Sequence, residues 1–212
     1  DYFNSDKILS DEFKEKFVTR IVEDKNNHFW VATRYEGLYR YDPFKGFDIF
    51  TNLFPEKKEF LEDIFIDSED RIWIAFETQL ILASITSSGG LHVRKHLDIN
   101  NVRSIKEDDD KNIWLGTWNG LFKVSVANDQ VVVDEIYSSN IPDICIFPSG
   151  DIIFSSFGEG IFHLKKGSKV PRLVDLPTGL NYLTSTCVTL YIDEQQRLWV
   201  GSYGNGALSY SG

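Results

Sequence analysis

Aromatic rings and hydrogen-bonding side chains recur together in five short stretches of this sequence. Each stretch contains an aromatic residue, in most cases next to an acidic residue, an asparagine or an arginine. Flat rings stack on the apolar face of a sugar, while Asn, Glu and Arg bond its hydroxyl groups, so this mixture could bind carbohydrate. The stretches are Arg34-Tyr35-Glu36, Phe76-Glu77-Thr78, Trp118-Asn119, Phe157-Gly158-Glu159 and Tyr203-Gly204-Asn205.

Trp118 is the leading candidate for a ligand contact, because Trp114 already supplies a core ring nearby and a second indole needs another reason. Arg34 and Glu36 follow as polar partners. The alternative is that each ring belongs to a repeated structural pattern and packs on the adjacent unit. The full candidate set is Trp118, Asn119, Arg34, Tyr35, Glu36, Phe157, Glu159, Tyr203 and Asn205.

Catalytic chemistry has weaker support in these stretches. Glu36, Glu77 and Glu159 could converge as the carboxylate pair of a glycosidase, which keeps an enzyme as an alternative. The segment Gly201-Ser202-Tyr203-Gly204 does not match the strand-to-helix corner of a nucleophilic serine. We therefore predict no catalytic residue, and a chain that is not itself an enzyme.

Metal-binding patterns are incomplete. The run Asp108-Asp109-Asp110-Lys111-Asn112 begins like a calcium loop, but Ile113 stands where such a loop needs Gly. His92 and His96 would lie about 13 Å apart along a strand, too far to share a metal ion. We predict no metal site and no cofactor.

A repeat supplies the elements that must position these stretches. Each copy has a short apolar alternation, a polar turn, a strand with an aromatic anchor, a second turn and a further strand. A strand-rich period near 40 residues predicts one four-stranded propeller blade per copy, with each anchor filling the gap between neighbouring blades. The anchors, at intervals of 40 to 45 residues, are Trp30, Trp73, Trp114, Phe154 and Trp199.

The predicted fold is therefore all-β: a β-propeller of about five four-stranded antiparallel blades, in one partial domain over residues 1–212. The last copy ends at its third strand, and residues 1–4 stand where a preceding fourth strand would. Either these ends pair to close a five-bladed ring, or the chain is excised from a larger propeller. The lack of any Met indicates a chain that is either processed or excised, and the repeat favours excision. The expected blades are 17–50, 60–96, 101–137, 142–175 and 187–212.

Composition narrows the classes of partner. The 22 basic and 32 acidic residues give a net charge of −10, which makes nucleic acid a poor partner. Apolar runs stay far below the ~20 residues of a membrane helix, so we expect no membrane insertion by this segment. Cys145 and Cys187 are predicted to be small buried residues, with a disulfide as the alternative. The charged runs 57–59 and 165–167 are expected to be solvated loops.

The third copy reads Ser104-Ile105-Lys106-Glu107-Asp108, then Ile113-Trp114-Leu115-Gly116-Thr117, then Gly120-Leu121-Phe122. This pattern resembles the two-component regulator propeller repeat. The first copy, with Phe29-Trp30-Val31-Ala32-Thr33, and the fifth, with Leu198-Trp199-Val200-Gly201-Ser202, are similar. Two copies depart from the pattern: Gln79 stands where the family has Gly, and Phe154 and Pro148 stand for its Trp and Asp.

The resemblance implies a context. Such propellers form the periplasmic sensor half of hybrid two-component regulators in gut Bacteroidetes, ahead of a membrane helix and a cytoplasmic histidine kinase. Many members sense oligosaccharides. It also implies seven blades rather than five, and as partners an oligosaccharide and an adjacent propeller or β-sandwich of the same parent chain. A second copy of the chain is a further candidate partner. The alternatives are a protein-interaction scaffold without signalling and a propeller lyase or glycosidase.

Overall fold

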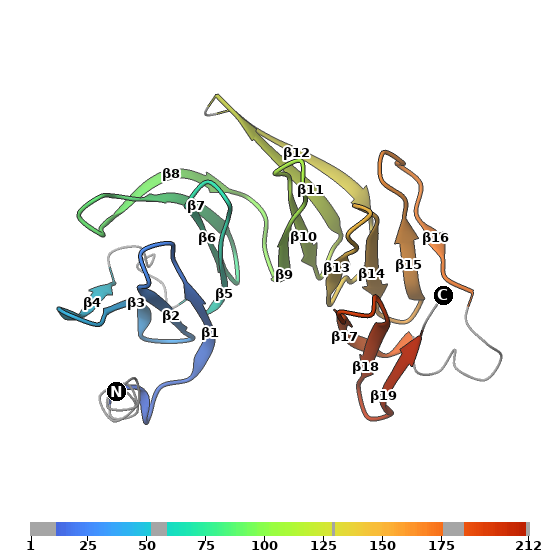
Figure 1. The fold of residues 1–212 in the computed structure, drawn as a ribbon, viewed down its shortest axis with the longest axis horizontal. Helices are drawn as coiled ribbons and strands as arrows, with labels where there is room; N and C mark the ends of the chain where they lie inside the picture. The colour runs from blue at the N-terminus through green and yellow to red at the C-terminus, as the bar shows by residue number, and fades with distance from the viewer. Residues whose placement is uncertain (1–11, 52–58, 129, 176–184, 211–212) are drawn as a thin grey trace. The chain divides into compact units, whose positions relative to one another are not determined.

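The computed structural model describes residues 12–51, 59–128, 130–175 and 185–210 (Figure 1). The chain forms two compact units, Asp1–Val102 and Arg103–Gly212. Within the described residues the regular structure consists of antiparallel sheets in which each strand pairs with the next along the chain. Such consecutive meanders of about four strands are propeller blades, and they confirm the predicted all-β fold of about five blades.

The first unit contains two four-stranded sheets, ordered β1-β2-β3-β4 and β5-β6-β7-β8. Its strands are β1 Val18–Glu23, β2 Phe29–Thr33, β3 Gly37–Asp42, β4 Gly46–Phe50, β5 Leu61–Ile66, β6 Arg71–Phe76, β7 Leu80–Ile85 and β8 Leu91–Leu97. Apolar side chains of the two sheets pack together in one core cluster that includes Trp30, Leu38, Leu61, Ile74 and Phe76.

The second unit contains a sheet ordered β12-β11-β10-β9, a sheet of β13 to β16 and a three-stranded sheet of β17 to β19. The predicted role of residues 1–4 as a fourth strand lies outside the described residues. The strands are β9 Val102–Glu107, β10 Ile113–Thr117, β11 Leu121–Ala127, β12 Gln130–Tyr137, β13 Ile144–Ile146, β14 Ile152–Ser156, β15 Gly160–Leu164, β16 Arg172–Leu173, β17 Cys187–Ile192, β18 Leu198–Ser202 and β19 Gly206–Tyr210.

A carboxylate locks the first turn of four blades to the tryptophan six residues later. In the second blade Asp67 accepts the Trp73 indole N–H at 2.8 Å, the Arg71 guanidinium at 2.6 Å and two backbone N–H groups. In three other blades the corresponding aspartate accepts a hydrogen bond from the indole N–H six residues later. The pairs are Asp24 with Trp30 at 3.0 Å, Asp108 with Trp114 at 2.8 Å and Asp193 with Trp199 at 2.8 Å. This bond explains why a polar turn and an indole recur together in the sequence.

Polar side chains also tie the first strands of neighbouring blades. In the first unit the Arg20 guanidinium donates to the Asp63 carboxylate at 2.5 and 3.1 Å. In the second unit Asp143 accepts hydroxyl hydrogen bonds from Ser104 at 2.8 Å and Thr189 at 3.2 Å, one from each adjacent sheet. These residues fill the same position of successive repeats, four residues before the turn position.

The aromatic anchors differ in burial. Trp30 and Trp73 are fully buried and Trp114 is 6% exposed, whereas Trp199 is 39% exposed. The opposite face of the Trp199 sheet packs on the β13–β15 sheet through Leu190 and Val200. Among the tryptophan anchors, Trp199 therefore keeps the largest exposed fraction within the part of the chain that the structure describes.

The fourth anchor also differs from the prediction by one residue. The turn bonds Phe147 N to Asp151 O, as Asp24 N bonds His28 O in the first blade, so Phe147 holds the aspartate position. Six residues later stands Ile153, which pairs with Cys145 as Trp30 pairs with Val22. Phe154 is fully buried but lies on the other face, in the cluster with Trp114. A shift of one residue along a strand reverses the face that a side chain occupies.

Both cysteines are buried free thiols between the β13–β16 and β17–β19 sheets. Burial raises the pKa of Cys145 to about 12 and that of Cys187 to about 11. No described helix is both long and apolar enough to span a bilayer. Within the described ranges no three His, Cys, Asp or Glu side chains gather as a metal site.

Candidate functional site

Arg34 in the β2–β3 loop is held by packing within the first unit. Its guanidinium lies 5.6 Å from the Phe17 ring centre and 4.8 Å from that of Phe60, and it donates to Glu62 at 2.9 Å. Its carbonyl also accepts the Leu61 amide at 3.2 Å. The predicted polar contact Arg34 thus joins the two sheets of its unit.

The neighbours of Arg34 have different surroundings. Tyr35 meets Phe60 edge-on at 5.3 Å, yet 59% of Tyr35 stays exposed. Glu36 carries a buried carboxylate oxygen, Oε2, that has no hydrogen-bond partner among the described residues. Of this loop, Tyr35 presents a ring surface and Glu36 an unused acceptor.

The equivalent loops of the second unit carry three exposed rings. Trp118 is 54% exposed, Phe157 45% and Tyr203 76%. The backbones beneath the last two are fixed, since Phe157 N bonds Asn140 O and Tyr203 N bonds Thr186 O, both at 2.8 Å. These loops therefore hold outward rings on a fixed backbone.

The polar candidates of the second unit mostly stabilise their own loops. Asn119 donates its backbone N–H to Thr117 Oγ1 at 3.0 Å, and the Asn205 side chain donates to Thr186 Oγ1 at 3.2 Å. Glu159 accepts hydroxyl bonds from Ser156 at 2.5 Å and Tyr137 at 3.0 Å. The Ser156 bond, with that of Tyr137, holds the pKa of Glu159 below its usual value, despite partial desolvation.

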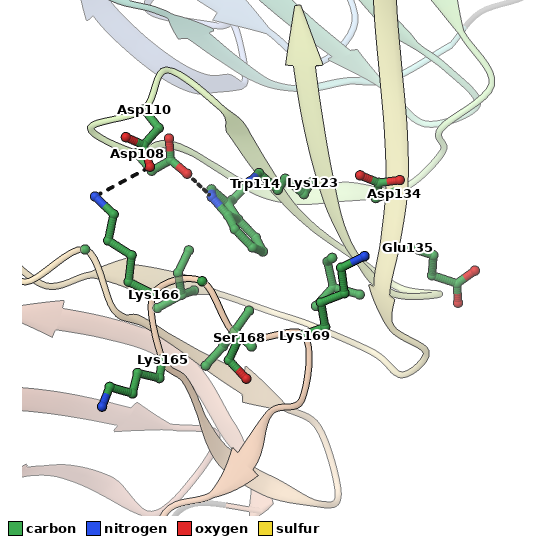
Figure 2. Close-up of a pocket in the computed structure, with 15 residues that line it drawn as sticks. Asp108, Asp110, Trp114, Lys123, Asp134, Glu135, Lys165, Lys166, Ser168 and Lys169 are labelled. Carbon is green, nitrogen blue, oxygen red and sulfur yellow. Dashed lines mark hydrogen bonds and ion pairs between the residues drawn. The ribbon is translucent and has the colours of Figure 1, made fainter.

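A pocket of about 300 Å³ lies at the other end of the strands of this unit, between the β9–β12 and β13–β16 sheets (Figure 2). One wall comes from the β9–β10 turn, β10, β11 and β12, and the other from the β13–β14 turn and the segment joining β15 to β16. It is lined by Asp108, Asp110, Trp114, Lys123, Asp134, Glu135, Ile136, Gly150, Ile152, Leu164, Lys165, Lys166, Gly167, Ser168 and Lys169.

Sequence reasoning missed this pocket because it treated residues 165–167 as a solvated loop. The side chains are indeed exposed, but residues 165–169 form the second wall of the pocket. The Lys166 amide donates to Asp151 at 2.8 Å, which is the first cause of the lowered pKa of Asp151, and His163 bonds the same carboxylate at 2.8 Å. Three lysines within five residues, 165–169, were the signal in the sequence.

Comparison with known proteins connects these blades to a family. The profile of the two component regulator propeller matches residues 12–35 and 96–119, so the chain carries repeats of that type. Histidine kinase P4 of Formosa agariphila is 31% identical over 114 residues, which is 49% of this chain and 8% of that protein. The chain thus spans a small part of the kinase that it matches.

Solved structures share the fold. The extracellular domain of a putative hybrid two component system from B. thetaiotaomicron aligns with a TM-score of 0.72 and 22% identity, over 90% of this chain and 26% of that one. PorZ of Porphyromonas gingivalis aligns with a TM-score of 0.72 and 14% identity, over 91% and 32%. Virginiamycin B lyase of Staphylococcus aureus aligns with a TM-score of 0.67 and 14% identity, over 92% and 70%. The chain is therefore similar in fold to the extracellular domain of a putative hybrid two component system and also to a lyase.

Proposed function

We propose that this chain is part of the periplasmic sensor region of a hybrid two-component histidine kinase, where it binds oligosaccharide and relays its presence. The observation that carries the proposal is the two component regulator propeller repeat, matched at two separate stretches of the chain. The similarity to an extracellular domain of a hybrid two component system supports it. Kinase activity would belong to other parts of the parent chain, with an adjacent propeller, a β-sandwich or a second copy as docking partners.

The exposed rings support a saccharide as the ligand. Trp118, Phe157 and Tyr203 occupy the same loop of three successive blades, and each leaves at least 45% of its surface open. Exposed rings on a fixed backbone can stack on sugar faces with little loss of side-chain freedom. Trp118 remains the residue on which the proposal places most weight.

Calorimetric titration of the chain with a panel of neutral and acidic oligosaccharides tests the proposal. Trp118→Ala is expected to weaken binding about tenfold, or ~1.4 kcal/mol. Phe44→Ala is the matched control, since Phe44 is 97% exposed but lies between β3 and β4, outside the candidate loops. If no member of the panel binds, oligosaccharide sensing is wrong; if binding survives Trp118→Ala, only the loop assignment is wrong.

A lyase or glycosidase is the second candidate, because a lyase shares the fold. Fold alone does not assign a reaction. The bonds from Ser156 and Tyr137 keep Glu159 ionised, which suits a binding or structural role better than that of a proton donor. Release of reducing ends from the same panel, abolished by Glu36→Gln, Glu77→Gln or Glu159→Gln, would establish the enzyme instead.

A further inference from the structure

We propose that the pocket between the β9–β12 and β13–β16 sheets binds one or two rings of a neutral saccharide, at a site separate from the exposed-ring loops. The inference rests on the proposed function only in taking a saccharide as the ligand. We call this site the inter-blade pocket.

In the first unit Arg40 fills the position beside Trp30. Arg40 pairs across the strands with Trp30, as Lys123 pairs with Trp114 in the second unit. The Arg40 guanidinium bonds Asp48 at 2.6 Å and lies against Gly89, where an added Cβ would stand 1.2 Å from Nη1. The space that borders Arg40 is only about 60 Å³.

In the second unit Lys123 stands at the corresponding position and lines the inter-blade pocket. The Lys123 ammonium lies 5.6 Å from the Trp114 ring centre, and about 300 Å³ remains between the sheets. This volume lies at the lower end of small-molecule sites. A hollow of about 600 Å³ in the first unit has no Phe, Tyr or Trp among its described lining residues. The inter-blade pocket, in contrast, has an aromatic side chain, Trp114, in its lining.

The floor of the inter-blade pocket is apolar. Trp114 is 6% exposed, and Ile152 and Leu164 are each 2% exposed. All three line the cavity, together with Ile136 of β12. Such a floor matches the C–H face of a sugar ring, while the hydroxyl groups point to the rim.

The rim is charged but balanced. The lining includes four lysines, three aspartates and one glutamate, so the formal charges of the lining residues cancel. A polyanion or a polycation would gain no net attraction from such a rim. Hydroxyl groups both donate and accept hydrogen bonds, so a neutral polyol can use carboxylates and ammonium groups together.

Several rim groups are already engaged and others are not. Asp108 accepts from Trp114 and Asn112, and Asp110 pairs with Lys166 at 3.5 Å. Lys169 and Asp134 form no ion pair with any described residue.

Lys169 and Lys165 point in different directions, so Lys165 can serve as the matched control for Lys169. Figure 2 shows Lys169 extending toward the strand that carries Asp134, and Lys165 extending away from the cavity. Lys169 and Asp134 thus offer a donor and an acceptor on opposite walls. Lys165 carries the same charge on the same turn without reaching the ligand.

The test is calorimetry of the whole chain with cellotriose, maltotriose, xylotriose and mannotriose, with inorganic phosphate and sulfate as anion probes. At least one trisaccharide is expected to bind, with affinity reduced about tenfold by Lys169→Ala and by Asp134→Ala, because each removes a charged hydrogen-bonding group. Lys165→Ala is expected to leave the affinity within about twofold, since its side chain points away from the cavity. Circular dichroism of each variant checks that the fold is retained.

Each other outcome overturns the proposal. Equal losses from Lys165→Ala and Lys169→Ala would mean that only overall charge matters. Displacement of the trisaccharide by millimolar phosphate would show an anion site instead, and no trisaccharide binding would remove the neutral ligand. Binding that is lost in Trp118→Ala but unchanged in Lys169→Ala would overturn the inter-blade pocket and leave the proposed function standing. If acidic oligosaccharides fail as well, the proposed function fails.

Discussion

Replacing Asp67 by alanine should destabilise the first unit strongly. Asp67 is 4% exposed and its carboxylate accepts four hydrogen bonds, from the Trp73 indole, the Arg71 guanidinium and two backbone amides. Arg71 is also 4% exposed and would retain only the more exposed Glu69, at 3.0 Å, as an ion-pair partner. Removing one partner of a buried ion pair costs roughly 3–5 kcal/mol, and the remaining Glu69 places the expected loss near the lower end.

The fifth blade offers an internal comparison. Asp193 accepts from the Trp199 indole at 2.8 Å and from the Arg197 guanidinium at 2.7 Å, the same arrangement as Asp67. The Trp199 bond is the first cause that lowers the pKa of Asp193 to about 2. Trp199 is 39% exposed, however, and 44% of the Arg197 side chain is exposed, so water can replace the lost acceptor. We expect Asp193→Ala to cost clearly less than Asp67→Ala.

Urea unfolding followed by circular dichroism measures both losses, and hydrogen exchange assigns each loss to its unit. Asp67→Asn keeps one acceptor oxygen and should fall between wild type and Asp67→Ala. Equal losses of stability for Asp67→Ala and Asp193→Ala would refute the reasoning that burial sets how much the aspartate–tryptophan hydrogen bond contributes. A negligible loss for Asp67→Ala would refute the ion-pair argument itself.

Three further outcomes are expected. Gly89→Ala should lower the free energy of unfolding in urea by more than about 1 kcal/mol, because it combines a positive φ with a clash against Arg40. Gly158→Ala, with a similar φ and no near contact, should lower it less. The reverse order would contradict the packing of Arg40. The pKa of Glu159 in the folded protein lies below 4.5, so its contribution to stability is complete above about pH 4.5 and is lost as the pH falls through the lower folded value. In acid titration, the stability of Glu159→Gln should therefore depend less on pH than that of the wild type. An unchanged slope of stability against pH would exclude the Ser156 bond as its cause. The buried thiols of Cys145 and Cys187 should resist alkylation at pH 8 in the folded protein and react on unfolding. Their pKa values of about 12 and 11 leave little thiolate. Labelling within minutes under native conditions would contradict their burial.

Local sequence determined the blades. An aspartate and a tryptophan six residues apart bond across a single turn, so the pattern that the sequence repeats is also the contact that shapes the turn. Strand alternation and turn residues act over similarly short distances. The all-β fold and the blades could therefore be predicted without coordinates, and only the fourth turn, with Phe147 in the aspartate position, misplaced an anchor by one residue.

The candidate sites depended on contacts between residues far apart in the chain. Arg34, a predicted ligand contact, packs between Phe17 and Phe60 and pairs with Glu62, 28 residues away. Trp199 has the same local bond as the other tryptophan anchors, yet 39% of it is exposed, whereas the other three are buried.

The inter-blade pocket shows most directly what the sequence alone could not decide. A repeat position holds Arg40 in one unit and Lys123 in the other, and both are basic residues beside a tryptophan. The space that borders Arg40 is about 60 Å³, whereas the pocket that Lys123 lines is about 300 Å³ and has its opposite wall in the next sheet, about 40 residues further along the chain. Hydrogen bonds within one turn can be read from neighbouring residues, whereas the volume between two sheets is set by side chains that only the folded chain brings together.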